Sequence, residues 1–292
     1  MLIGVIPNLS KPDALPVCQD VISWLRLRNC DVLLSQTAAD RLGYEGLGAD
    51  DEQLAEACDL IIVLGGDGTL LSVVRRWPFW GVPVLGINLG NLGFLTELEL
   101  PELHSGLERV LRGDYSVQER LMLRAQVKRG SRIVSEMYAL NDVVVTRGSL
   151  SRLLRLDVMI DGEYLDRLPA DGVIVSTPTG STAYSLSAGG PIVDPRTSVL
   201  LVTPICAHTL HSRPLVVSPE STISIVVAAP HEDVLLSMDG QESFRLSPDD
   251  QVIVGRSPTV ARFIRLRTRS FYEVLRKKLR DSGLSHGPKE DA

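Results

Sequence analysis

Hydrophobic residues in the first 114 positions alternate between short continuous runs and longer stretches with helical spacing. A continuous run such as 60–64 is typical of a strand buried on both faces, whereas the apolar residues from Val17 to Leu25 recur at the spacing of one helix face. Strands that alternate with helices predict an α/β domain with a parallel sheet. The expected strands are 2–6, 31–35, 60–64 and 82–88, and the expected helices are 12–28, 50–57, 69–76 and 101–112.

From about residue 115 the pattern changes to β-rich runs that are separated by turn residues such as Asp161-Gly162. These runs predict an all-β domain, built as a sandwich or layered sheet. Residues 270–279 return to helical spacing, and we expect that helix to pack on the first domain. The expected strands are 143–146, 154–160, 173–176, 199–203, 222–228 and 251–254. The expected units are an α/β domain over 1–114, a β sandwich over 115–268, a C-terminal helix over 269–281 and a polar tail over 282–292.

Composition narrows the class of partner. The net charge of −6 argues against non-specific nucleic-acid binding, which needs clustered Lys and Arg. No stretch approaches the ~18 apolar residues of a membrane span, and the chain starts in a strand-like run without a signal-peptide pattern. The four cysteines have no C-x-x-C spacing. We therefore expect a cytoplasmic protein that binds neither nucleic acid nor membrane.

A glycine-rich loop, Gly65-Gly66-Asp67-Gly68-Thr69, follows the buried run 60–64 and precedes a helix. The carboxyl end of a parallel strand that opens into a helix N-terminus is a common anion-binding position, and glycines let the backbone approach phosphate. An aspartate within such a cradle suits two tasks, which are holding Mg²⁺ or accepting a proton from an attacking hydroxyl. The alternative is a tight turn in which Asp67 caps the helix.

Two common nucleotide-binding motifs are excluded. There is no G-x-x-x-x-G-K-[ST], because no lysine follows a glycine loop. There is also no G-x-G-x-x-G, because Leu71 stands where the third glycine belongs. Neither a Walker-type NTPase nor a dinucleotide fold of the hydride-transfer type is supported.

Three further segments carry candidate chemistry. Residues 88–96 again follow a strand and contain glycines three apart, which suits either a loop that closes over a ligand or a simple turn. Asn141-Asp142 combines an amide with a carboxylate, which can read a base or ribose, although such pairs also form turns. Residues 171–191 are dense in hydroxyls and small residues around Tyr184, a composition that favours a ligand-binding loop over a plain connection.

In these segments the chain closely resembles the NAD kinase family. The resemblance spans nearly the whole chain in order, and the 171–191 segment is its most specific part. Its glycine loop is shared with diacylglycerol-type lipid kinases and resembles that of phosphofructokinases. The matching segments are 65–69, 88–96, 141–142, 171–191, 204–210, 213–214, 239–241 and 271–275.

The resemblance implies that a nucleotide-binding α/β domain and an NAD-binding β sandwich together transfer the γ-phosphoryl of ATP to the adenosine-ribose 2′-hydroxyl of NAD. It implies Asp67 as the proton acceptor and a homodimer or homotetramer. The family chemistry also implies Mg²⁺ or another divalent cation with ATP, whose protein ligands stay unknown. The implied binding residues are Gly65, Gly66, Gly68, Thr69, Asn88, Asn141, Asp142, Arg152, Pro169, Asp171, Thr179, Thr182, Ala183, Tyr184, Ser185, Leu186, Ser187 and Gln241.

Some residues depart from the family or keep two interpretations. Ala207 and His211 stand where many relatives have Pro and Ser, and we expect those positions to affect assembly more than chemistry. His208 and His211 are three apart, but a structural or interface role is favoured over a metal pair because no third ligand is evident. Arg152 lies in a basic cluster that suits either phosphate or a solvated face.

Two other functions remain open from the sequence. A diacylglycerol-type lipid kinase would need membrane attraction, yet the chain is acidic and shows no basic amphipathic helix. A non-catalytic NAD(P) sensor would keep the site without the chemistry. The sequence leaves undecided whether ATP or polyphosphate is the donor, whether NADH is accepted, and how many copies assemble.

Overall fold

A computed structural model of the chain describes residues 1–76, 81–90, 93–148, 153–208, 211–228, 233–266 and 269–283. These residues form two compact units. The first consists of Met1–Val73, Val82–Gln118 and Arg262–Ala292, and the second of Val74–Gly81 and Glu119–Ala261. Three elements contribute residues to both units: α4 (Asp67–Arg76), β7 (Ser116–Arg129) and β18 (Asp250–Arg265).

The first unit is built on a parallel sheet. Its strand order is β3-β2-β1-β4-β5, and every neighbouring pair in that order is parallel. At the β5 edge the sheet also pairs in parallel with β6 and, through Phe263, with the end of β18. The strands are β1 (Leu2–Pro7), β2 (Asp31–Ser35), β3 (Gly48–Ala49), β4 (Leu60–Gly65), β5 (Val84–Asn88) and β6 (Leu98–Glu99).

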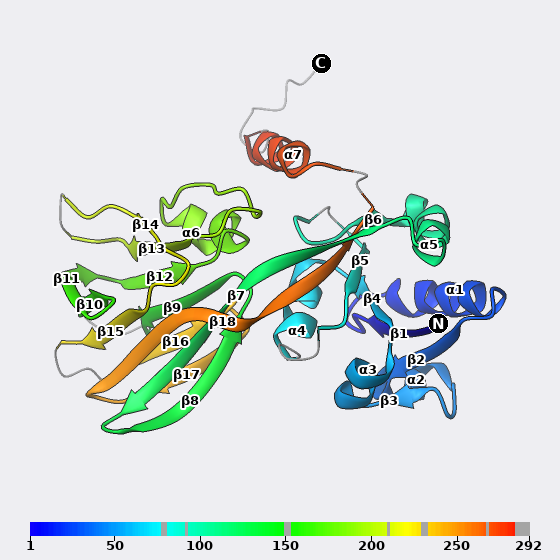
Figure 1. Ribbon diagram of the computed structural model, residues 1–292, viewed down its shortest axis with the longest axis horizontal. Helices are drawn as coiled ribbons and strands as arrows, with labels where there is room; N and C mark the ends of the chain where they lie inside the picture. The colour runs from blue at the N-terminus through cyan, green and yellow to red at the C-terminus, as the bar shows by residue number, and fades with distance from the viewer. Residues whose placement is uncertain are drawn as a thin grey trace, which may run out of the picture. The chain divides into compact units, whose positions relative to one another are not determined.

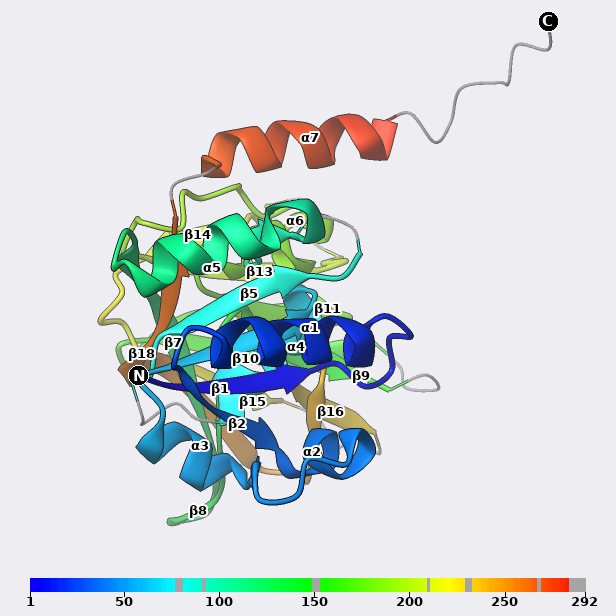
Figure 2. The same cartoon turned by 90° about the vertical axis from the view of Figure 1, so that its right-hand side faces the viewer.

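Helices cover both faces of this sheet, as continuous apolar strands require. Figure 2 shows α1 in front of the strands and α4 behind them. Alternate strand residues such as Ile3 and Val5 share a core with Ile22 of α1, whereas a Cβ on Gly4 would lie 3.3 Å from Leu54 of α3. The helices are α1 (Ala14–Arg26), α2 (Gln36–Leu42), α3 (Asp51–Ala57), α5 (Leu103–Leu111) after the 3-10 turn Leu100–Glu102, and α7 (Phe271–Gly283).

The second unit is an antiparallel β sandwich. One sheet has the order β11-β10-β15-β18 and continues through β7 and β8, and the other has the order β14-β13-β12-β9-β16-β17. Apolar residues of both sheets, such as Val143, Leu156 and Val254, fill one core between them. Figure 1 shows β7 and β18 as two long ribbons. The remaining elements are β8 (Arg132–Ala139), β9 (Asp142–Arg147), β10 (Leu154–Ile160), β11 (Glu163–Ala170), β12 (Gly172–Ser176), β13 (Leu200–Ile205), β14 (Leu215–Val217), β15 (Ile223–Val227), β16 (Val234–Met238), β17 (Glu242–Leu246), the 3-10 turn η2 (Gly180–Thr182) and α6 (Tyr184–Ser187).

The predicted fold class is confirmed, because a parallel α/β unit, an antiparallel sandwich and a C-terminal helix are all present. The local predictions were incomplete, because no strand was expected at β3, β6, β7, β8, β11, β14, β16 or β17. The pattern did not predict α2, a helix of seven residues that buries only Ala38 and Ala39 and therefore shows little amphipathic periodicity. The strand expected at 251–254 extends over Asp250–Arg265. Among the described residues, no helix combines the length and the apolar character needed to cross a membrane.

Candidate active site

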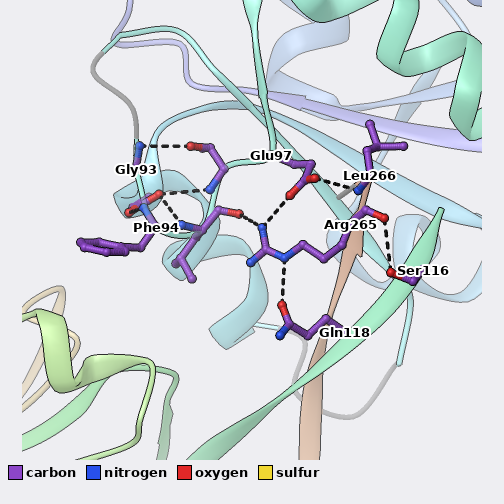
Figure 3. Close-up of polar contacts among 10 residues, drawn as sticks. Gly93, Phe94, Glu97, Ser116, Gln118, Arg265 and Leu266 are labelled. Atoms are coloured by element: carbon purple, nitrogen blue, oxygen red, sulfur yellow. Dashed lines mark hydrogen bonds and ion pairs between the residues drawn. The ribbon is translucent and has the colours of Figure 1, made fainter. Parts of the chain in front are cut away.

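Asp67 lies where the sequence placed it, separated from the end of β4 only by Gly66, and it is the first residue of α4. Its carboxylate accepts three consecutive backbone N–H groups. Oδ2 accepts the N–H of Phe94 at 2.7 Å, and Oδ1 accepts those of Leu95 at 3.0 Å and Thr96 at 3.3 Å. Figure 3 shows the turn at Gly93 and Phe94 that supplies these donors. Successive N–H groups that converge in this way form an anion-binding concavity, and here the anion is a side chain of the protein.

The hydrogen bonds leave Asp67 with capacity for one more partner. A carboxylate has about four lone-pair positions, and the turn uses three of them. The remaining position belongs to Oδ2, which accepts one of the three bonds. Asp67 is half-exposed, so a hydroxyl from a ligand can reach it. The bonds run to a turn 27 to 29 residues away, so the carboxylate organises a second loop besides starting α4.

The glycines near Asp67 are required by side chains of the protein itself. A Cβ on Gly93 would overlap the Asp67 carboxylate, and one on Gly65 would overlap the side chain of Thr69. A Cβ on Gly66, by contrast, would meet nothing closer than Asn88 Oδ1 at 4.0 Å. Of these three positions, only Gly66 therefore has the open space that close approach of a phosphate needs.

Two residues that the sequence analysis did not single out lie beside the glycine loops. Asn8 Nδ2 donates to Thr69 Oγ1 at 2.9 Å, and Lys11 Nζ lies 2.8 Å from where a Cβ on Gly90 would stand. The buried Asn88 bonds both polar groups of the Gly90 backbone, donating at 2.6 Å and accepting at 3.2 Å. The sequence held one clue to these two residues. Asn8 and Lys11 follow the first strand, and because neighbouring parallel strands end at the same edge of a sheet, residues after that strand can lie near the glycine loop after β4.

The second unit gathers another group of predicted residues around the start of β9. Asp239 accepts the N–H groups of Leu140 at 3.0 Å, Asn141 at 2.8 Å and Asp142 at 3.1 Å. Asp239 has a φ of 51°, a left-handed conformation that Asp and Asn tolerate better than most residues. Asp239 was not among the predicted binding residues, although the matching segment 239–241 contains it. Its role is to shape the Asn141-Asp142 turn.

Asp142 is a buried carboxyl with an altered acidity. It is 4% exposed, and burial followed by the negative charge of Asp239 raises its pKa to about 7, against a lowering effect from the backbone N–H of Tyr184. Burial and then the charges of Cys206, Asp171 and Asp142 raise the pKa of the Tyr184 hydroxyl. Near neutral pH, Asp142 can therefore either donate or accept a hydrogen bond.

The 171–191 segment is docked on the same turn. The Thr177 hydroxyl donates to the Leu140 carbonyl at 2.6 Å and accepts the Gly180 N–H at 3.0 Å. A Cβ on Gly180 would overlap the Asn141 backbone, so only glycine fits there. The expected long loop contains the short elements η2 and α6, which turn the segment back on itself.

The remaining predicted residues of this unit differ in what their side chains can offer a ligand. Thr179 and Ser185 are buried and bonded within the protein, the first to Arg120 and the second to Thr203. Asp171 pairs with Arg147 at 2.7 Å. Thr182, Ala183, Leu186 and Pro169 are half-buried, and Tyr184, Ser187 and Gln241 are exposed. Arg152 lies outside the described residues.

Comparisons with known proteins identify the family of the chain. The model of the ATP-NAD kinase N-terminal domain matches residues 3–115, and that of the ATP-NAD kinase C-terminal domain matches 140–266. The NAD kinase of Moorella thermoacetica is 50% identical, covering 96% of this chain and 90% of the relative, and that of Symbiobacterium thermophilum is 47% identical, covering 94% and 98%.

Solved structures have the same fold. A yeast NADH kinase complexed with NADH is 28% identical with a TM-score of 0.87, covering all of this chain and 90% of that one. An NAD kinase from Archaeoglobus fulgidus in complex with ATP has a TM-score of 0.75 at 24% identity, covering 96% and 99%, and supports the fold alone. From both domain matches and these relatives, the chain belongs to the NAD kinase family and phosphorylates NAD to NADP.

Proposed function

We propose that Asp67 accepts the proton of the adenosine-ribose 2′-hydroxyl of NAD while that oxygen attacks the γ-phosphorus of ATP. The O2′–Pγ bond forms, the bond from Pγ to the bridging oxygen of ADP breaks, and the proton passes to the Asp67 carboxylate. The observation that supports this role is the unused lone pair at Oδ2 on a carboxylate that three backbone N–H groups hold in place. A fixed acceptor suits this reaction, because alignment of the weak hydroxyl nucleophile is the main catalytic task.

The second unit is proposed to hold NAD. Asn141 offers an amide and Asp142 a buried carboxyl with a pKa near 7, so together they can match both donor and acceptor groups of the nucleoside. Exposed Tyr184 offers an aromatic face beside them. The other predicted residues keep their proposed contact roles with NAD, and these are Pro169, Asp171, Thr182, Ala183, Tyr184, Leu186, Ser187 and Gln241. For Thr179 and Ser185 the bonds within the protein favour a supporting role, in which they hold the segment in shape.

The phosphates of ATP are proposed to lie against the open backbone at Gly66, with Lys11, whose Nζ lies beside Gly90, as the cation, and Gly68 keeps its proposed binding role. Within the described ranges no group of three or more His, Cys, Asp or Glu side chains is placed to hold a metal ion. With few protein ligands grouped together, the site suits a divalent cation that is bound largely by the phosphates of ATP, which is the usual mode for Mg²⁺. The cation would neutralise phosphate charge during transfer.

Lys11→Ala tests the phosphate contact. We expect the KM for ATP to rise about tenfold with a smaller change in the KM for NAD, because loss of a charge-assisted contact to phosphate is worth roughly 1.5 kcal/mol. Steady-state kinetics with each substrate varied in turn measure both constants. Equal changes in the two KM values would contradict the assignment.

Asp67→Asn tests the central claim. Purified protein is incubated with ATP, Mg²⁺ and NAD, and a dehydrogenase strictly dependent on NADP reports the product. We expect turnover to fall by ~10²–10⁴, the range for loss of an acid–base group, while NAD still binds by calorimetry. Asp20→Asn, the same change on the exposed face of α1, is the control and should keep wild-type turnover.

Other outcomes of this assay separate the alternatives. Near-wild-type turnover in Asp67→Asn would remove its proposed role. NAD or NADP binding without product, with either ATP or polyphosphate, would favour a sensor. NADH in place of NAD tests the range of acceptors. We also propose a cytoplasmic homodimer or homotetramer, on the resemblance alone, and light scattering on purified protein measures the mass.

A further inference from the structure

A buried ion pair lies behind the turn that holds Asp67. Arg265 Nη1 is 3.0 Å from Glu97 Oε2, and their side chains are 15% and 7% exposed. The other Glu97 oxygen accepts the N–H of Leu266 at 2.7 Å. Both carboxylate oxygens are therefore engaged, and Glu97 ties the chain after the turn to the end of β18.

Arg265 makes direct contact with the turn itself. Nη1 donates to the carbonyl of Leu95 at 3.1 Å, and Nε donates to Gln118 Oε1 at 3.0 Å. Figure 3 shows the guanidinium between Glu97 and Gln118. The N–H of Leu95 donates to Asp67 Oδ1. Leu95 is thus held from two sides, by Arg265 at its carbonyl and by Asp67 at its N–H.

We propose that Arg265, oriented by Glu97, is a positioning residue for the phosphoryl transfer. It fixes the 93–96 turn, and the turn in turn fixes the direction in which the free lone pair of Asp67 meets the 2′-hydroxyl. The inference rests on the proposed role of Asp67 as proton acceptor. It adds the ion pair that keeps the Asp67 carboxylate aligned.

The chemistry of the pair fits positioning better than stability alone. Replacing a buried ion pair by well-packed apolar residues is often neutral or stabilising, so an ion pair here is poorly explained by stability. A guanidinium is a planar fork with donors in fixed directions, and Arg265 uses them on Leu95, Glu97 and Gln118 at once. A lysine would keep the charge but would lose this geometry.

The experiment compares Arg265→Lys with wild type, alone and in the Asp67→Asn background. In wild type we expect kcat to fall about tenfold, while the KM for NAD and NAD binding by calorimetry change by less than about threefold. In Asp67→Asn we expect the same change at Arg265 to lower kcat by less than about twofold, since the group that it positions is already lost. Glu97→Gln is the second variant, with the same pattern expected.

A second arginine–carboxylate pair, in the sandwich, serves as the control. Arg129 and Asp250 form a two-bond pair at 2.7 and 2.9 Å, in which the Asp250 side chain is 0% exposed and that of Arg129 is 47% exposed. Arg129→Lys makes the same chemical change away from the Asp67 turn. We expect it to lower thermal stability and to leave kcat of the folded enzyme unchanged, which separates positioning from general loss of structure.

The outcomes are distinguishable. A wild-type kcat in Arg265→Lys and Glu97→Gln would overturn the inference, and so would an equal fold loss of kcat in both backgrounds, because that marks a structural role independent of Asp67. Wild-type turnover in Asp67→Asn would instead overturn the proposed acceptor role, and the positioning role through Asp67 with it.

Discussion

Two turns of this chain are built in the same way, one in each unit. In the first unit the carboxylate of Asp67 accepts the N–H groups of residues 94–96, and in the second that of Asp239 accepts those of residues 140–142. The surroundings differ. Asp67 is half-exposed, whereas burial raises the pKa of Asp239, and the three N–H bonds oppose that rise.

By our proposal, the first carboxylate takes part in the reaction, whereas the second shapes a turn. Asp67 keeps an open lone pair, and the Arg265–Glu97 pair braces its turn from behind. Asp239 lies beside a second carboxyl, Asp142, whose pKa is raised to about 7 and which, by our proposal, binds the ligand instead. By our proposal, the same pattern of hydrogen bonds therefore serves reaction chemistry in one unit and nucleotide recognition in the other.

The largest stability effect that we expect within this comparison belongs to Asp142→Asn. The folded pKa of Asp142 lies above its unfolded value, so the stability that it contributes is full below about pH 4 and is lost as pH rises through about 7. Asn cannot ionise, so the variant without ligand should be more stable than wild type near pH 8, by up to about 4 kcal/mol, with the difference closing toward pH 4. Urea unfolding at both pH values measures it.

Asp157→Asn is the control of opposite sign. The hydrogen bond from Arg167 and, less strongly, its charge lower the pKa of Asp157, so that carboxylate stabilises the fold above its unfolded pKa, and this stability is lost as pH falls. This variant should be less stable than wild type near neutral pH, with the difference closing in acid.

The pH dependence decides the Asp142 prediction. If the difference in stability between Asp142→Asn and wild type did not change with pH, that would contradict a pKa of Asp142 that burial raises.

Asp239→Ala and Asp239→Asn together test whether the number of hydrogen bonds or the charge of Asp239 stabilises the second turn. Alanine leaves three N–H groups without their acceptor in a φ of 51°, and we expect the free energy of unfolding to fall by about 3 kcal/mol. Asparagine keeps one carbonyl oxygen, which accepts two of the bonds at Oδ1, and tolerates this φ, so about half of that loss is expected. Equal losses would mean that charge, not bond number, holds the turn.

The smallest effect expected is steric and belongs to the first turn. Gly93→Ala pushes a methyl group onto the Asp67 carboxylate, so kcat should fall about tenfold with little change in the KM for ATP. At Gly66 the added methyl group has open space in the protein, so Gly66→Ala should raise the KM for ATP instead. The same kinetic pattern in both variants would contradict the division between a glycine for Asp67 and a glycine for phosphate.

Much of the architecture could be predicted from local pattern. Continuous apolar runs such as 60–64 become buried strands, and the switch to β-rich runs near residue 115 marks the sandwich, because periodicity reports which faces are buried. The position of Asp67 at a strand-to-helix junction was also predictable from spacing. The helix α2 was not, since its seven residues bury too few apolar side chains to show a period.

By itself, the sequence determined the fold class, the family motifs and part of the set of candidate residues, because local pattern and short continuous segments carry them, whereas Lys11, Asp239 and Arg265 were not among its candidates. Only the tertiary structure decided their bonding. It turned the three N–H groups of residues 94–96 onto Asp67, placed Asp239 under residues 140–142, and brought Arg265 to Leu95 across 170 positions of sequence. These contacts join segments far apart in the chain, and no local propensity or spacing encodes which distant donor meets which acceptor.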